Sequence, residues 1–171
     1  MMQIRKLGWM VVLGGCVSGA AWAHGGHDMP VDQGVATPAA GLSVSGCWIR
    51  QLPSPLPSGG YLVIHNTGSA AVTLQSVQSP DYGQVMMHQT TESGGMSAMS
   101  MASNLQVPAG GTFTFKPGSY HLMMEHPRAG LKVGDVSHLQ FRLENGQQFS
   151  ADCDVKPANT LDGTDSGHAS H

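Results

Sequence analysis

The feature that most constrains the fold lies near the C-terminal end of the chain. Residues 136–144 and 147–155 each alternate apolar and polar side chains, and Asn145-Gly146 stands between the two runs. An Asn-Gly pair flanked by alternating runs is the strongest short-range signal for a β-hairpin. Because such a hairpin buries only one of its faces, it needs further strands to pack against.

The rest of the chain supplies those strands. Short apolar segments follow one another between turn signals such as Pro80-Asp81, residues 108–111 and Pro117-Gly118. Many short strands at this spacing predict an all-β fold, a sandwich or Greek-key barrel. The remaining predicted strands are 42–50, 60–66, 72–78, 83–89, 104–107, 112–116 and 120–124.

The N-terminus reads as an export signal. Arg5 and Lys6 precede an apolar stretch over residues 7–17, and Ala21-Trp22-Ala23 has the small-x-small pattern of a cleavage site. The stretch is too short and too rich in glycine for a membrane span. A lipoprotein signal, with lipid attachment at Cys16, is the alternative. Either interpretation takes the chain out of the cytoplasm, and we expect it in the periplasm.

These features divide the chain into four parts. We expect a signal peptide over 1–23, a flexible arm over 24–41, one β-domain over 42–156 and a polar tail over 157–171. After cleavage the chain keeps six Lys and Arg against eleven Asp and Glu, a formal charge of −5. A nucleic-acid partner, which would require a clustered basic face, is therefore not expected.

Two cysteines remain after cleavage, Cys47 and Cys153. In an oxidising compartment an isolated pair predicts one disulfide, here between the start and the end of the domain. Two buried free thiols are the alternative interpretation.

Histidine and methionine gather in the middle of the domain. Met86, Met87 and His88 end one predicted strand, and a Gly/Ser/Met-rich loop is expected to follow it. Residues two apart in a strand face the same side, so His121 and Met123 project together. His88 and Met99 complete a shell of two imidazoles and two thioethers. Such soft, uncharged ligands suit Cu(I), and thioethers argue against zinc, magnesium and calcium.

The spacing of these four residues resembles the signature of the periplasmic CuA copper chaperones, the PCuAC family. His88 is separated from Met99 by ten residues, Met99 from His121 by twenty-one, and His121 from Met123 by one. Further similar segments are 47–50, 59–61, 117–121 and Gly134-Asp135. The resemblance covers about residues 42–156.

The resemblance implies a cupredoxin-like β-barrel with a Cu(I) site at its surface. It also implies a partner that accepts copper, such as the CuA subunit of cytochrome c oxidase or another copper chaperone. Thioether and imidazole ligands would release Cu(I) by ligand exchange to an acceptor with stronger thiolate ligands. No enzymatic activity is expected.

Other histidines and methionines are candidates for auxiliary roles. Met86 lies two residues before His88 and so faces the same side of the predicted strand, which makes it a possible extra ligand. Met96 and Met101 are expected to shield or extend the site. Cleavage after Ala23 would make His24 the N-terminus, whose amine and imidazole suit Cu(II). The auxiliary Cu(II) candidates are His24, His27, His168 and His171, and the residues expected to be structural or solvated are His65, His126 and His138.

Three other functions compete with a chaperone. A blue-copper electron carrier needs a cysteine thiolate beside histidines, and neither remaining cysteine has a histidine in the next few residues. A histidine-brace copper enzyme needs His24 fixed in the fold, but a loose linker follows it. A copper-sequestering protein without a dedicated client would use the same site, and the sequence does not separate it from a chaperone.

Overall fold

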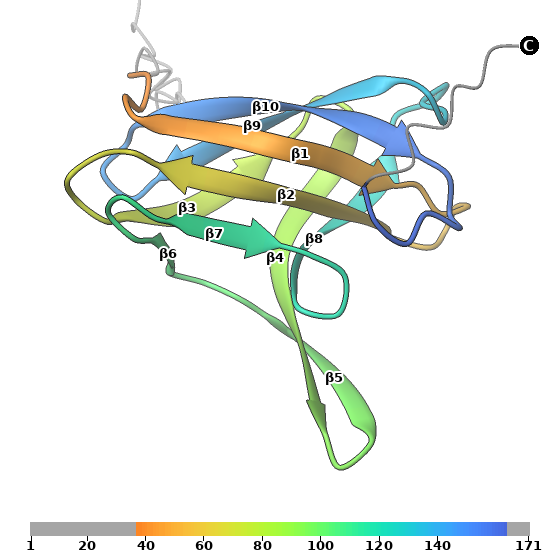
Figure 1. Cartoon of the computed structure of the whole chain (residues 1–171). Helices are drawn as coiled ribbons and strands as arrows, with labels where there is room; N and C mark the ends of the chain where they lie inside the picture. Colours follow the sequence, from red (N-terminus) through yellow and green to blue (C-terminus); the bar gives the residue numbers. More distant parts are fainter. Residues whose placement is uncertain (1–36, 164–171) are drawn as a thin grey trace, which may run out of the picture. The chain divides into compact units, whose positions relative to one another are not determined.

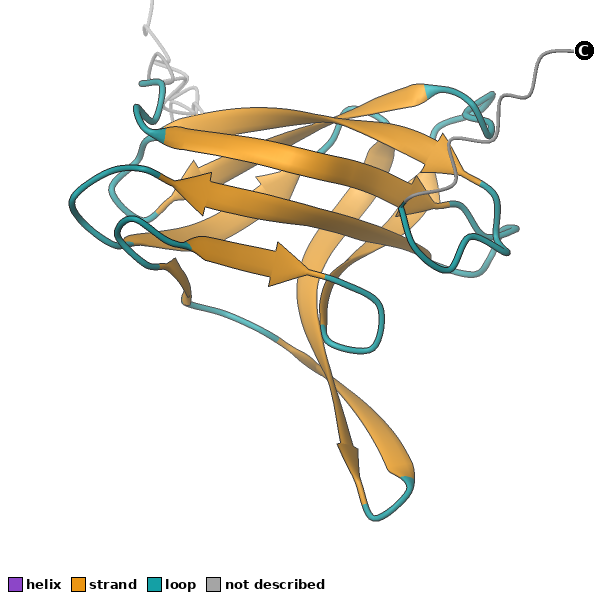
Figure 2. Cartoon of the chain, in the orientation of Figure 1, coloured by secondary structure: helices purple, strands orange, loops and turns teal. Residues whose placement is uncertain are grey.

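The computed structural model describes residues 37–163, which form ten β-strands and contain no helix (Figure 2). The predicted all-β class is therefore confirmed. The strands are β1 (Leu42–Arg50), β2 (Ser58–Asn66), β3 (Val72–Gln78), β4 (Tyr82–Ser93), β5 (Met96–Met101), β6 (Leu105–Val107), β7 (Thr112–Phe115), β8 (Tyr120–Pro127), β9 (Val136–Leu143) and β10 (Gln148–Lys156).

The strands form one sheet that folds over into a sandwich (Figure 1). Its order is β5-β4-β8-β2-β1-β10-β9-β3-β6, and β7 also pairs with β2. Among the pairings of these ten strands, only that of β1 with β10 is parallel. Strand β2 pairs with β1 along one side and with β8 and then β7 along the other. This branching lets the sheet curve around a single core.

Apolar side chains from both layers meet in that core. In β9 every second residue is buried, as the alternating sequence predicts. Burial of these side chains is the main stabilising contribution to a fold of this kind. The largest fully buried side chains are Ile49, Leu62, Ile64, Leu74, Val107, Phe115, Leu122, Met124, Leu139, Phe141, Leu143 and Val155.

The predicted C-terminal hairpin is confirmed by the register of β9 and β10. Phe141 pairs with Phe149, and their rings stack with centroids 4.8 Å apart. Gly146 takes a positive φ of 82°, which the turn between the strands requires and glycine adopts without strain. The local turn signal and the cross-strand packing therefore agree.

Cys47 and Cys153 form the predicted disulfide, which ties β1 to the neighbouring strand β10. The pairing of β1 with β2 shifts between Ser45 and Trp48, and Gly46 in this bulge has a φ of 58°. The link closes a loop of 106 residues, which would stabilise the fold by roughly 4 kcal/mol.

The prediction of a loop after His88 is wrong. Strand β4 continues to Ser93, and Gly94-Gly95 turns the chain into β5. Both glycines have positive φ, 61° and 76°, as a tight two-residue hairpin turn demands. The resulting β4–β5 hairpin extends away from the rest of the sandwich (Figure 1).

The predicted signal peptide, Cys16 and most of the N-terminal arm lie outside the described residues. The auxiliary Cu(II) candidates also lie outside these residues: His24, His27, His168 and His171. What the sequence predicts for all of these residues stays a prediction. Within residues 37–163, the structure has no helix that is long and apolar enough to cross a membrane.

Candidate metal site

The candidate site lies on the face of β4 and β8 that points away from the core. The two strands are antiparallel, with His88 paired to His121 and Met86 paired to Met123. Directly paired residues share a face of the sheet, and residues two apart on one strand share it as well. Both histidines and both of these methionines therefore lie on one face.

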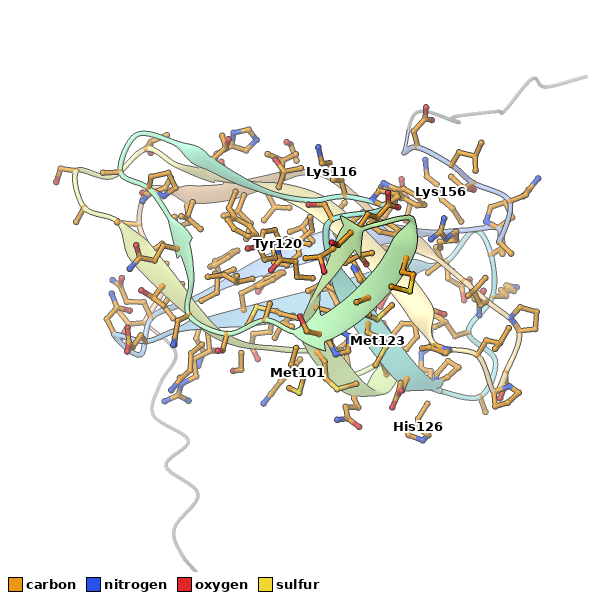
Figure 3. The ribbon with its side chains drawn as sticks, turned by 90° about the horizontal axis from the view of Figure 1, so that it is seen from below. Met101, Lys116, Tyr120, Met123, His126 and Lys156 are labelled. Carbon is orange, nitrogen blue, oxygen red and sulfur yellow. A yellow bond between two sulfur atoms is a disulfide. The ribbon has the colours of Figure 1, made fainter. Side chains whose placement is uncertain are left out.

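The β5 strand adds further sulfur to this face. Met101 pairs with His88 on its other side, so Met101, His88 and His121 form one row across three strands. Met99 shares the face but pairs with Thr90, two residues further from that row and thus roughly 7 Å along the strand. Figure 3 shows Met101 and Met123 on the side of the molecule that carries the hairpin.

The methionines on β5 are exposed and the histidines are buried. Met99 and Met101 expose 57% and 74% of their surface, whereas His88 exposes 8% and His121 9%. Met96, also predicted as an auxiliary residue, has the opposite parity on β5 and pairs with Ser93 near the turn. The structure therefore places Met99 and Met101 on the histidine face and Met96 on the other.

The ring nitrogens of His88 are the least satisfied polar atoms of the site. Both are buried, and neither has a hydrogen-bond partner. The rings of His88 and His121 lie edge to face, with centroids 6.0 Å apart. Native structures nearly always pair buried polar atoms, and a neutral imidazole has one N–H and one lone pair, so a metal ion could serve as the partner of one of these nitrogens.

A hydrogen bond to a nearby backbone carbonyl orients the ring of His121. Its Nδ1 lies 3.0 Å from the carbonyl oxygen of Ser119, which can only accept a hydrogen bond. Nδ1 is therefore the donor, and Nε2 keeps its lone pair free. In many metal-binding histidines, the ring nitrogen that does not bind the metal donates a hydrogen bond of this type, which fixes the ring.

Burial and charge keep His88 neutral. Burial lowers the pKa of His88, repulsion from His121 lowers it further, and the nearby Glu125 carboxylate partly opposes both. A neutral imidazole has a lone pair available for a metal at neutral pH. The environment therefore favours the form of His88 that binds a metal ion.

Met87 and Met124 show that parity separates two kinds of methionine. Both have the opposite parity to the histidines on their strands, and both are buried in the core with Leu122. The prediction that Met124 faces away from His121 is confirmed. Met86 and Met123 on the site face are only partly buried.

The chemistry of the donor set favours a soft metal ion. In the described part of the chain, no three His, Cys, Asp or Glu side chains gather where they could hold a metal. A metal bound between His88 and His121 could draw further ligands from the methionine sulfurs on the same face. Imidazole and thioether together suit Cu(I).

Two polar residues near the site were not anticipated from the sequence. Gln84 and Glu125 pair with each other, two residues along their strands from Met86 and Met123. They therefore lie on the same face of the sheet as these methionines. The Gln84 amide donates to Met86 Sδ at 3.3 Å. Their even spacing from His88 and His121 along the strands indicates a shared face, but a lone Gln and a lone Glu form no ligand motif.

The remaining histidines lie elsewhere in the fold. His65 is hydrogen-bonded to Ser45 at 2.7 Å, and His138 is paired with Asp152 at 2.6 Å. His126 is exposed, near the end of β8. None of the three lies opposite His88 or His121 in the register.

Solved structures with the same fold include PCuAC domains, which have a cupredoxin-like β-sandwich. The copper-bound PCuAC domain from PmoF2 is 18% identical with a TM-score of 0.56, over 68% of this chain and 93% of that one. The solution structure of CuI-DR1885 from Deinococcus radiodurans is 24% identical with a TM-score of 0.55, over 76% and 85%. This chain therefore has the fold of the PCuAC domains.

The comparison of sequences identifies the family of this chain. The model of the LpqE-like family matches residues 42–155, and this chain belongs to that family. A Leifsonia xyli subsp. xyli protein named "Putative lipoprotein Lxx21020" is 27% identical over 119 residues, which are 69% of this chain and 71% of that protein.

Proposed function

We propose that this protein is a copper chaperone that binds one Cu(I) ion through His88, Met99, His121 and Met123. Support comes first from His88, whose two buried ring nitrogens have no hydrogen-bond partner and whose ring packs edge to face with that of His121. It comes second from Met123, which neighbours that histidine pair on the same face. The copper-bound state of the PmoF2 domain and the CuI state of DR1885 show that this fold accommodates copper in other proteins.

The hairpin supplies the fourth ligand in this proposal. Met99 has the required spacing, whereas Met101 lies directly opposite His88 in the register. All six residues of β5 are exposed, so few contacts hold the hairpin in one position. A small bend of the hairpin would carry Met99 to the histidines, and Met101 would then cover the ion.

Release follows from the same ligand set. Thioether and imidazole bind Cu(I) less strongly than thiolate, so an acceptor with cysteine ligands gains the ion by stepwise exchange. The exposed hairpin gives such an acceptor access before the donor ligands leave. We propose export to the periplasm and, as the client, a copper-accepting protein such as the CuA subunit of cytochrome c oxidase.

A pair of adjacent methionines offers a matched test. Met123→Leu removes sulfur from the site face with little change in volume, and it should weaken Cu(I) binding about tenfold or more. Met124→Leu makes the same change on the core face and should leave Cu(I) binding unchanged. Anaerobic competition with a Cu(I) chelator measures both, and equal affinities in the two variants would contradict the proposed shell.

A further inference from the structure

The site face of β8 continues across β2 onto β1. Gly59 on β2 pairs with Met123 on one side and with Arg50 on the other. Tyr61, two residues along β2, shares the face of Gly59 and pairs with Trp48. The proposed copper ligand Met123 is therefore the cross-strand neighbour of a glycine with large side chains around it.

The phenol of Tyr61 occupies the space that a side chain at Gly59 would fill. A methyl group added at Gly59 would overlap the Tyr61 hydroxyl and would lie 2.9 Å from Cζ. Side chains of directly paired residues start only about 5 Å apart. The phenol over Gly59 therefore lies within one strand spacing of the side chain of Met123.

Two contacts hold the phenol in this position. Arg50 donates from Nη2 to the Tyr61 hydroxyl at 2.6 Å, and its guanidinium carbon lies 5.3 Å from the ring centroid. The Trp48 ring lies on Tyr61 with centroids 4.5 Å apart. Tyr61 consequently exposes only 3% of its surface, although it lies on the outer face of the sheet.

We propose that Tyr61, anchored by Arg50 and seated over Gly59, is a positioning residue for Met123. This inference rests on the proposed function, since it assigns Tyr61 a role toward a ligand of the Cu(I) ion. Methionine has three freely rotating side-chain bonds, so a free thioether samples many directions. A fixed ring beside Met123 removes rotamers that point away from the histidines, which lowers the entropy lost when copper binds.

The metal-free protein tests the packing itself. With ¹³C-methyl-labelled methionine, the Met123 methyl signal should shift in Tyr61→Phe, which loses the Arg50 anchor. It should also shift in Gly59→Ala, which displaces the phenol. Tyr82→Phe, at the far end of β4, is the matched control and should leave the signal in place. An unchanged Met123 signal in Tyr61→Phe and in any folded Gly59→Ala protein would overturn the proposal.

Cu(I) competition then tests the consequence for binding. Tyr61→Phe should weaken the Cu(I) affinity of the full chain about two- to tenfold, and Tyr82→Phe should not change it. Parent affinity retained in Tyr61→Phe would overturn this inference and leave the proposed function intact. Failure of the parent protein to bind Cu(I) would instead overturn the proposed function, and with it the copper role of Tyr61.

Discussion

His88 is a residue whose proposed role in metal binding lowers the stability of the metal-free protein. Both of its ring nitrogens are buried without a partner. An unsatisfied buried polar group costs about 1–3 kcal/mol, so the apo protein carries a local penalty at this position. A metal ion that bonds to one nitrogen removes part of that penalty and couples binding to stability.

Replacement of His88 by leucine should therefore separate stability from binding. We expect His88→Leu to unfold in urea with a free energy equal to that of the metal-free parent or up to about 1 kcal/mol higher. The same variant should lose Cu(I) binding. Met87→Leu, its neighbour in the core, is the control for local packing.

The contrary result is equally clear. A loss of more than about 1 kcal/mol in His88→Leu, without a matching loss in Met87→Leu, would mean that the imidazole makes a stabilising bond in the apo fold. The buried nitrogens would then not be a vacancy for a metal.

At the residue scale, the alternation of side chains along a strand predicts which of the candidate residues share a face. The alternation of a strand is enough to put His121 and Met123 together, and Met124 on the core side. The partner of His88 on β5 was not predictable, because it depends on the register of the hairpin. Likewise, nothing in the order of residues shows that Tyr61 reaches back over Gly59.

The β4–β5 hairpin is the element on which the proposed site depends most. It forms the edge of the sheet, and β5 is exposed along its whole length. The segment is rich in Gly, Ser and Met, and glycine has low strand propensity, so its composition predicts a loop. The overlooked signal was Gly94-Gly95, a dipeptide that favours a two-residue hairpin turn.

Disturbing this turn should affect the site without affecting the fold. Gly95 has a φ of 76°, where a β-branched residue is strained, so Gly95→Val should loosen the hairpin alone. We expect Cu(I) affinity to fall severalfold while the thermal midpoint of the apo protein stays within a few degrees. Gly94→Asn, which tolerates positive φ, is the control and should bind copper like the parent. Unfolding of the whole domain by Gly95→Val would contradict this independence.

Stability of the whole molecule depends on contacts far from the copper face. Asp81, between β3 and β4, forms an ion pair with Arg128 and accepts a hydrogen bond from the backbone N–H of His138 in β9. Burial raises the pKa of Asp81, but the bonds from Arg128, Ser137 and His138 outweigh it, so this pKa lies below its usual value. One carboxylate thus links three segments of the sandwich.

A lowered pKa fixes the direction of the pH dependence. The contribution of Asp81 is complete above the unfolded value of about 3.8 and is lost as pH falls through the lower folded value. At pH 7, Asp81→Asn should reduce the free energy of unfolding by about 1–3 kcal/mol. The gap between variant and parent should narrow below about pH 4, and urea unfolding at pH 7 and pH 3 measures it. A gap that is unchanged or wider at pH 3 would refute this assignment.

Copper K-edge X-ray absorption during an anaerobic Cu(I) titration tests the central claim most directly, because it reports ligand type and number together. The account predicts saturation at one Cu(I) per chain, with nitrogen and sulfur both in the first coordination shell. The sulfur contribution should fall in Met123→Leu and stay constant in Met124→Leu. A shell of nitrogen and oxygen alone, or a spectrum that is the same in both variants, would contradict it.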